Sequence, residues 1–84
     1  MYVNRESVRA VRVVEDRTLW MYRMMANARQ PRKHREREVP CPHFVELLVD
    51  ATWTRVEECD NADDADARAA VFAAEYGLVA ARGV

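Results

Sequence analysis

The sequence contains few of the residues that build disulfide-rich, membrane-spanning or loop-rich proteins. Its 84 residues include two cysteines, two glycines and three prolines. Two cysteines exclude a disulfide framework, and because no signal-peptide pattern opens the chain, they favour a reducing, cytoplasmic setting. No run of eighteen apolar residues exists, so the sequence predicts no membrane-spanning helix.

Motifs for catalysis, metals and cofactors are also missing. There is no glycine-rich phosphate-binding loop and no helical pair of carboxylates spaced for a metal. His34, Cys41, His43 and Cys59 are zinc-type ligands, but their spacing differs from that of structural zinc sites. A nucleophile built on Cys41 and His43 would lack an oxyanion hole. We therefore predict no enzyme, no metal and no cofactor, and leave open whether these four side chains approach one another.

The charge is divided along the chain, although the net charge is only −1. Residues 1–38 carry ten Arg and Lys against five Asp and Glu, whereas residues 39–84 carry three against nine. Opposite charges of this kind favour attraction between the halves, or between subunits. The length allows one domain, residues 1–84, that buries a modest fraction of its surface.

The apolar pattern from Val8 to Ala28 predicts a long first helix. Asn4, or alternatively Ser7, is the expected N-cap, and Pro31 ends the helix at or before Gln30. One stripe has the three- and four-residue spacing of a helix face. Its members are Val11, Val14, Thr18, Met21, Met25 and Ala28. Because Val13, Leu19 and Trp20 form a second apolar patch, this helix needs cover on two sides.

The remaining pattern predicts a loop and two more helices. Residues 29–42 combine three prolines with basic residues and are expected to form the loop. A second helix starts at Pro40 or Pro42 and ends near Asp60. A third runs from Asp64 to about Arg82, with Asp63 or Asp64 as its cap. Gly77 either continues this helix, which the periodicity favours, or ends it.

These elements predict an all-α, three-helix bundle-like domain with a long first helix, completed by dimerisation. Six residues of the three predicted helices are the expected interface. They are Val13, Trp20, Met21, Met24, Trp53 and Gly77. Methionine is unbranched and adaptable, so Met21 and Met24 suit a surface that accepts a partner.

The function favoured by the sequence is a small interaction or regulatory protein that self-associates and binds a larger protein partner. Size and class suit a bacterial or phage accessory factor. The alternative is binding of nucleic acid or a nucleotide by the basic loop. Its candidate residues are Arg29, Arg32, Lys33, Arg35 and Arg37. The acidic second half would oppose such binding if it faced the same way.

Overall fold

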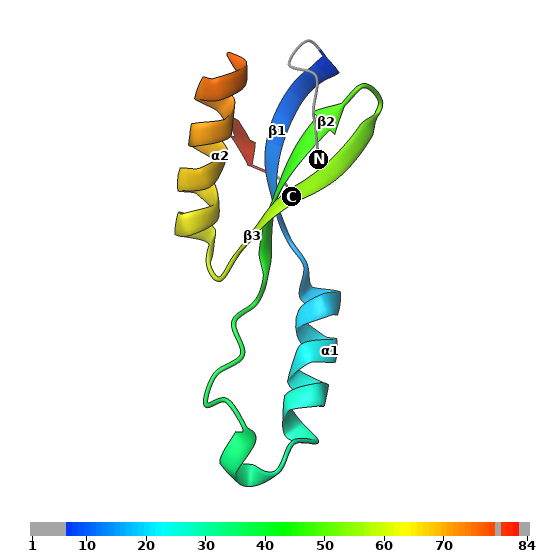
Figure 1. The fold of residues 1–84 in the computed structure, drawn as a ribbon, viewed down its shortest axis with the longest axis vertical. Helices are drawn as coiled ribbons and strands as arrows, with labels where there is room; N and C mark the ends of the chain where they lie inside the picture. Colours follow the sequence, from blue (N-terminus) through cyan, green and yellow to red (C-terminus); the bar gives the residue numbers. More distant parts are fainter. Residues whose placement is uncertain (1–6, 79, 83–84) are drawn as a thin grey trace.

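The computed structural model describes residues 7–78 and 80–82, and the elements within this part of the chain form a sheet with a projecting helical arm (Figure 1). The order of elements is β1 (Val8–Glu15), α1 (Arg17–Ala28), the 3₁₀ helix η2 (Arg32–His34), β2 (His43–Val49), β3 (Thr52–Cys59), α2 (Ala62–Tyr76) and β4 (Ala80–Arg82). The expected N-cap at Asn4 lies outside the described residues.

The four strands lie in the order β3-β2-β1-β4. β1 pairs antiparallel with β2, β2 pairs antiparallel with β3, and the short β4 pairs parallel with β1. The chain returns from β3 to β4 through α2, which packs mainly against β1 and β2. The predicted all-α, three-helix bundle is therefore wrong, since three of the four strands form an antiparallel sheet.

The first half of the predicted first helix is β1. A bulge between Val8 and Ala10 shifts the register of its pairing with β2. Val8 and Val11 are consequently both buried although they are three residues apart, which is the spacing of a helix face. Helical structure begins only at Arg17, after Asp16, whose side chain accepts a hydrogen bond from Leu19 N at 2.9 Å.

The predicted second helix is the β2–β3 hairpin. Its two-residue turn, Asp50 and Ala51, contains no glycine, and Asp50 takes a positive φ of 56°. Asp tolerates the left-handed region better than most residues do, so the turn forms without the usual sequence signal. The apolar run of β2 reflects its central place, with Val45 and Leu47 buried under α2.

The predicted third helix exists, but it starts at Ala62 and ends at Tyr76. Asn61 rather than Asp63 or Asp64 is the N-cap: its side chain accepts a hydrogen bond from Asp64 N at 2.8 Å. Gly77 adopts φ 68° and is the left-handed C-cap. Continuation of the helix through Gly77, which the periodicity favours, is wrong, and the alternative is correct.

One apolar core lies between α2 and the sheet. Its buried residues come from β1, β2 and the inner stripe of α2: they are Val8, Val11, Val13, Val45, Leu47, Ala65, Ala69 and Ala73. Phe72, Tyr76 and Leu78 pack around it. The small alanines let the helix approach the sheet closely, so a helix with few large side chains still covers this face.

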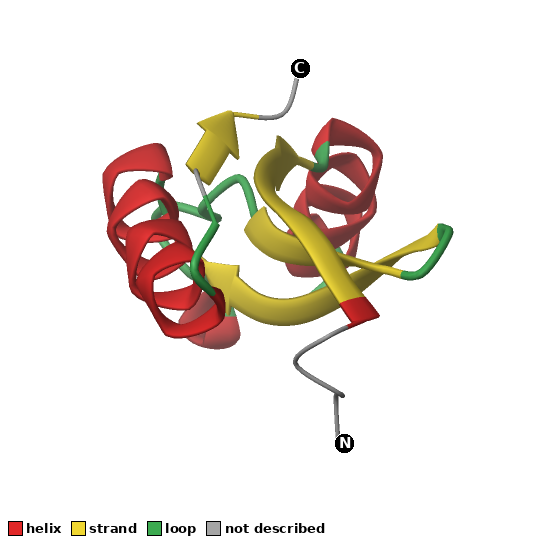
Figure 2. Ribbon diagram, turned by 90° about the horizontal axis from the view of Figure 1, so that it is seen from above, coloured by secondary structure: helices red, strands yellow, loops and turns green. Residues whose placement is uncertain are grey.

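Helix α1 leaves the sheet and, with the segment 29–42 that returns to β2, forms what we call the arm (Figure 1). The arm makes the molecule elongated, with extents of 48 × 22 × 22 Å. Viewed along the long axis, α1 and α2 lie on opposite sides of the strands (Figure 2). No residue of α1 is buried, so this helix stands outside the core.

Candidate functional site

The inner face of α1 carries the half-buried Leu19 and Trp20 together with Arg23 and Asn27, and it is held by hydrogen bonds. Trp20 Nε1 donates to the carbonyl oxygen of Val39 at 2.8 Å. The Asn27 side chain makes two hydrogen bonds to the backbone of Glu36, at 2.9 and 3.1 Å. These contacts fasten the helix to the returning segment. They use the polar groups of α1 on the side that faces its own chain.

Two ion pairs join the base of the arm to β3. Arg23 binds both carboxylate oxygens of Glu58, at 2.7 and 2.9 Å. Arg55 donates to Asp16, the N-cap of α1, at 2.8 Å. The Arg23 guanidinium lowers the pKa of Glu58, and the hydrogen bond from Leu19 N, followed by that from Arg55, lowers the pKa of Asp16. Both carboxylates are thus stabilised in their charged form.

The outer face of α1 is apolar and exposed. Met21 is 58% exposed, Tyr22 66%, Met24 41% and Met25 50%. A helix that packs on its own protein normally turns its apolar stripe inward and its polar side chains to water. In α1 Leu19 and Trp20 do face inward, but four more large side chains remain in contact with water. We use "outer face" for these four side chains, which form the strongest candidate interaction surface on the described part of the chain.

A second exposed stripe lies on α2, on the side away from the core. Ala67, Ala70, Val71 and Ala74 recur at three- and four-residue spacing, and all four are exposed, Val71 by 50%. Small side chains at this spacing leave a shallow surface on which another helix can pack closely. We call these four residues the alanine stripe.

The five basic residues of segment 29–37 lie at the end of the arm, around η2 (Figure 1). We call them the basic tip: they are Arg29, Arg32, Lys33, Arg35 and Arg37. All five are exposed, and none forms an ion pair with a described carboxylate. Elsewhere, by contrast, five arginines do have carboxylate partners, namely Arg12, Arg17, Arg23, Arg55 and Arg68.

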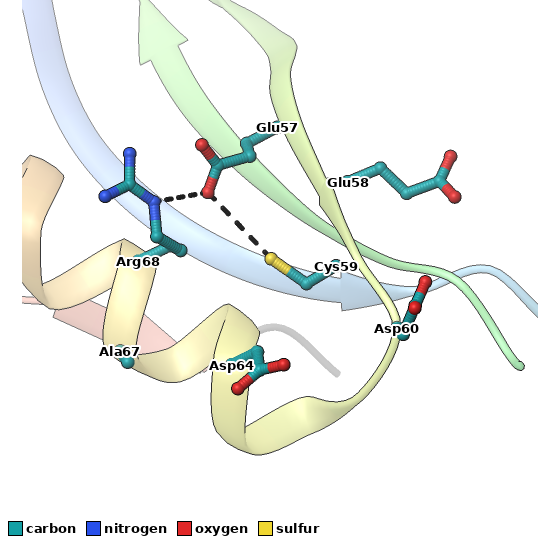
Figure 3. Close-up of a pocket in the computed structure, with 7 residues that line it drawn as sticks. All are labelled: Glu57, Glu58, Cys59, Asp60, Asp64, Ala67 and Arg68. Atoms are coloured by element: carbon teal, nitrogen blue, oxygen red, sulfur yellow. Dashed lines mark hydrogen bonds and ion pairs between the residues drawn. The ribbon is translucent and has the colours of Figure 1, made fainter.

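An acidic groove of about 510 Å³ lies between the end of β3 and the first turns of α2 (Figure 3). Glu57, Glu58, Asp60 and Asp64 line it together with Cys59, Ala67 and Arg68. Arg68 neutralises Glu57, and the Cys59 thiol lies 3.9 Å from the same carboxylate. Burial, followed by the nearby charge of Glu57, raises the pKa of Cys59, so its thiol stays protonated at neutral pH.

The four zinc-type side chains are only partly brought together. His43 and Cys59 are partners across β2 and β3, while His34 belongs to η2 at the end of the arm. His43 Nδ1 bonds the backbone oxygen of Cys41 at 2.9 Å, and the Cys41 thiol donates to Glu15. Burial, followed by that hydrogen bond, raises the pKa of Cys41. Within the described residues, no three His, Cys, Asp or Glu side chains are arranged to hold a metal ion.

The face of the sheet turned away from α2, which we call the open face, carries a charge network. Glu46 binds Arg12, with Nη2–Oε1 at 2.7 Å, and Arg55, with Nε–Oε2 at 2.9 Å. Each guanidinium lies 4.0 Å from the centroid of an aromatic ring, Arg12 over Trp53 and Arg55 over Phe44. Sequence analysis missed this network because its members come together only through strand register.

The residues expected at an interface occupy different places. Met21 and Met24 lie on the outer face of α1. Val13 is 5% exposed and belongs to the core, and Gly77 caps α2. Trp20 faces the returning segment of the arm, and Trp53 lies beneath Arg12. The structure therefore brings the two methionines together with Tyr22 and Met25, and separates them from the other four residues.

Comparison with known proteins finds no family, no curated protein and no solved structure that the chain matches. No helix in the described part of the chain has the length and apolar character needed to cross a membrane.

Proposed function

We propose that this protein is a self-associating interaction module in which α1 of one copy docks on the alanine stripe of α2 of a second copy. The observation that carries the proposal is the outward-facing methionine and tyrosine surface of α1. A 12-residue helix is marginal in water without packing partners. Burial of this surface would stabilise the arm as well as the dimer.

A second copy suits this surface in charge and shape. Helix α1 carries Arg17 and Arg23 and no carboxylate, whereas α2 carries four carboxylates and one arginine. Arg17 is exposed and can steer α1 toward the acidic helix, whereas Arg23 is already held by Glu58, and apolar burial supplies the affinity. Long methionine side chains adapt to the shallow surface that small alanines leave. Because each copy has both surfaces, two reciprocal contacts satisfy a two-fold axis.

The proposed function is that of a binding protein rather than an enzyme. We also propose that the protein is cytoplasmic, and the free thiols of Cys41 and Cys59 support this localisation. The dimer would leave the end of each arm accessible to a larger partner.

The test is the mass in solution, measured by light scattering and sedimentation from low to high micromolar concentration. Met21→Lys with Met25→Lys should convert the dimer to a monomer, because both side chains are half exposed and their loss leaves the core intact. Ala51→Lys with Thr52→Lys adds the same charge at the exposed hairpin turn and should leave the dimer unchanged.

A second variant, Ala70→Lys with Ala74→Lys, tests the docking surface on α2. We expect it to dissociate the dimer as well. If only the methionine variant dissociates it, α1 pairs with α1 and the reciprocal arrangement is wrong. A wild-type protein that is monomeric at high micromolar concentration would contradict self-association. The outer face would then be a binding surface for a different protein.

A further inference from the structure

The loop that carries the basic tip is ordered mainly by backbone and amide groups. His34 N donates to the Pro31 oxygen at 2.8 Å, which closes the turn of η2. Arg35 Nε donates to the Gln30 oxygen at 2.9 Å, and Asn27 clamps the backbone of Glu36. Backbone and amide groups, together with the Arg35 side chain, thus fix the loop. The cationic groups project from it without carboxylate partners among the described residues.

Ion pairing of the basic residues differs between the tip and the rest of the described chain. In the sheet and helices, five arginines have carboxylates within 4 Å, so charge there is largely compensated inside the molecule. Residues 29–38 contain five basic residues against Glu36 and Glu38, and both acids are exposed. The end of the arm therefore presents a concentrated positive charge to solvent, which favours a ligand that carries several negative charges.

The acidic second half of the chain does not oppose such a ligand at this position. The acidic groove lies where β3 meets α2, whereas η2 lies at the far end of the arm (Figure 1). Two of the carboxylates beside the arm are also occupied, Glu58 by Arg23 and Asp16 by Arg55. Screening at physiological salt, over about 8 Å, weakens what remains of the repulsion.

We propose that the basic tip binds the phosphate backbone of double-stranded nucleic acid, without dependence on base sequence. Residues 29–38 contain no Phe, Tyr or Trp, and the single aromatic ring among them, that of His34, does not form the platform on which single-strand binding proteins stack successive bases. Clustered Arg and Lys side chains on a projecting loop suit contacts to phosphates along a duplex. The proposal does not depend on self-association.

The test is fluorescence anisotropy of a labelled 20-base-pair DNA duplex of mixed sequence, titrated with the full chain at 50 to 200 mM salt. If three to four basic residues contact phosphates, affinity should fall about 40- to 150-fold over this range. Arg32→Gln with Lys33→Gln should reduce the fall to about 4- to 12-fold, because two contacts are lost. Both side chains are exposed, and circular dichroism will show that the fold is kept.

The matched control is Arg9→Gln, which removes one exposed charge outside both the tip and α1 and is compared with Arg32→Gln alone. It should leave the salt dependence as in the wild type, and light scattering will establish that its mass is unchanged. The proposal is overturned by an equal loss in this control, by absence of duplex binding at 50 mM salt, or by tighter binding to a single strand of the same length. Binding to phosphatidylserine vesicles without binding to DNA also overturns it.

Discussion

Glu46 is the residue whose replacement gives the sharpest test of the sheet. Its side chain is 6% exposed, and it lies between the guanidinium groups of Arg12 and Arg55 on the open face. Glu46→Gln keeps the shape of the side chain but removes the charge. The amide can accept from one arginine, while its NH₂ group then faces the donors of the other. We therefore expect the variant to fold with lower stability.

The size of the effect follows from the exposure of the arginines. Removing one partner of a fully buried ion pair costs about 3 to 5 kcal/mol. Because the side chains of Arg12 and Arg55 are 34% and 42% exposed, water stabilises them after the change, and we take about 2 kcal/mol. A loss of this size lowers the melting temperature of so small a domain by roughly 8 to 16 °C.

The assay is thermal and urea denaturation followed by circular dichroism, at one protein concentration so that self-association does not alter the comparison. The control is Glu57→Gln, the same change at a more exposed pair with Arg68, which should cost about 0 to 1 kcal/mol. Adding Arg12→Gln should cost less in the Glu46→Gln background than in the wild type. A Glu46→Gln protein within about 0.5 kcal/mol of wild type would refute the reasoning.

Further changes test the C-cap of α2 and the contacts that hold the arm. Gly77→Ala should cost about 1 kcal/mol in thermal denaturation because φ is 68°, although nothing lies within 4 Å of the added Cβ, and Gly77→Asn should cost less. The pKa values of Asp16 and Glu58 lie below their ordinary 3.8 and 4.5 in the folded protein, so the stability they provide is present above those values and lost as the pH falls through the folded pKa. Acid denaturation should be shallower for Glu58→Gln, and an unchanged profile would contradict its pairing. Trp20→Phe removes the indole donor of the arm, so hydrogen exchange in α1 should accelerate about fivefold while the sheet core keeps its protection.

The part of the fold that the sequence predicts well is the part governed by local chemistry. Helix α2 has a capping residue, Asn61, that bonds Asp64 three positions later, and a glycine, Gly77, whose backbone ends the helix. Between them alanine recurs with helical spacing. Each signal acts within a few residues, so the helix is found from the sequence and only its ends are misplaced.

The strands are missed because their sequences lack the alternating pattern and the turn glycine that usually indicate strands. The bulge in β1 gives Val8 and Val11 the spacing of a helix face, and the hairpin turn has Asp50 where glycine is usual. A single residue, Asp16, separates the end of β1 from the start of α1, so the sequence shows no break between strand and helix. Only the pairing with β2, a long-range contact, decides which half of that segment is extended.

The candidate surfaces also differ in whether local sequence or long-range contacts determine them. The basic tip follows from composition, because charged residues between prolines form a solvated loop in any fold. The outer face of α1 could be predicted as an apolar stripe, but a helix wheel assigns such a stripe to the interior. That it faces water depends on Trp20, Arg23 and Asn27, whose polar groups bond the returning segment and β3. Those partners lie 9 to 35 residues away in the sequence.

The arm carries two different surfaces within one short segment, the apolar outer face of α1 and the basic tip. Hydrogen bonds on its inner face fix the direction of α1, so that its apolar side chains and its basic end project at different places. Apolar burial gives an affinity that salt alters little, whereas phosphate contacts weaken steeply with salt. The proposed self-association and the proposed binding of nucleic acid are therefore expected to respond differently to salt. Raising the salt concentration should weaken the proposed binding of nucleic acid at the basic tip and leave the proposed dimer contact of the outer face in place.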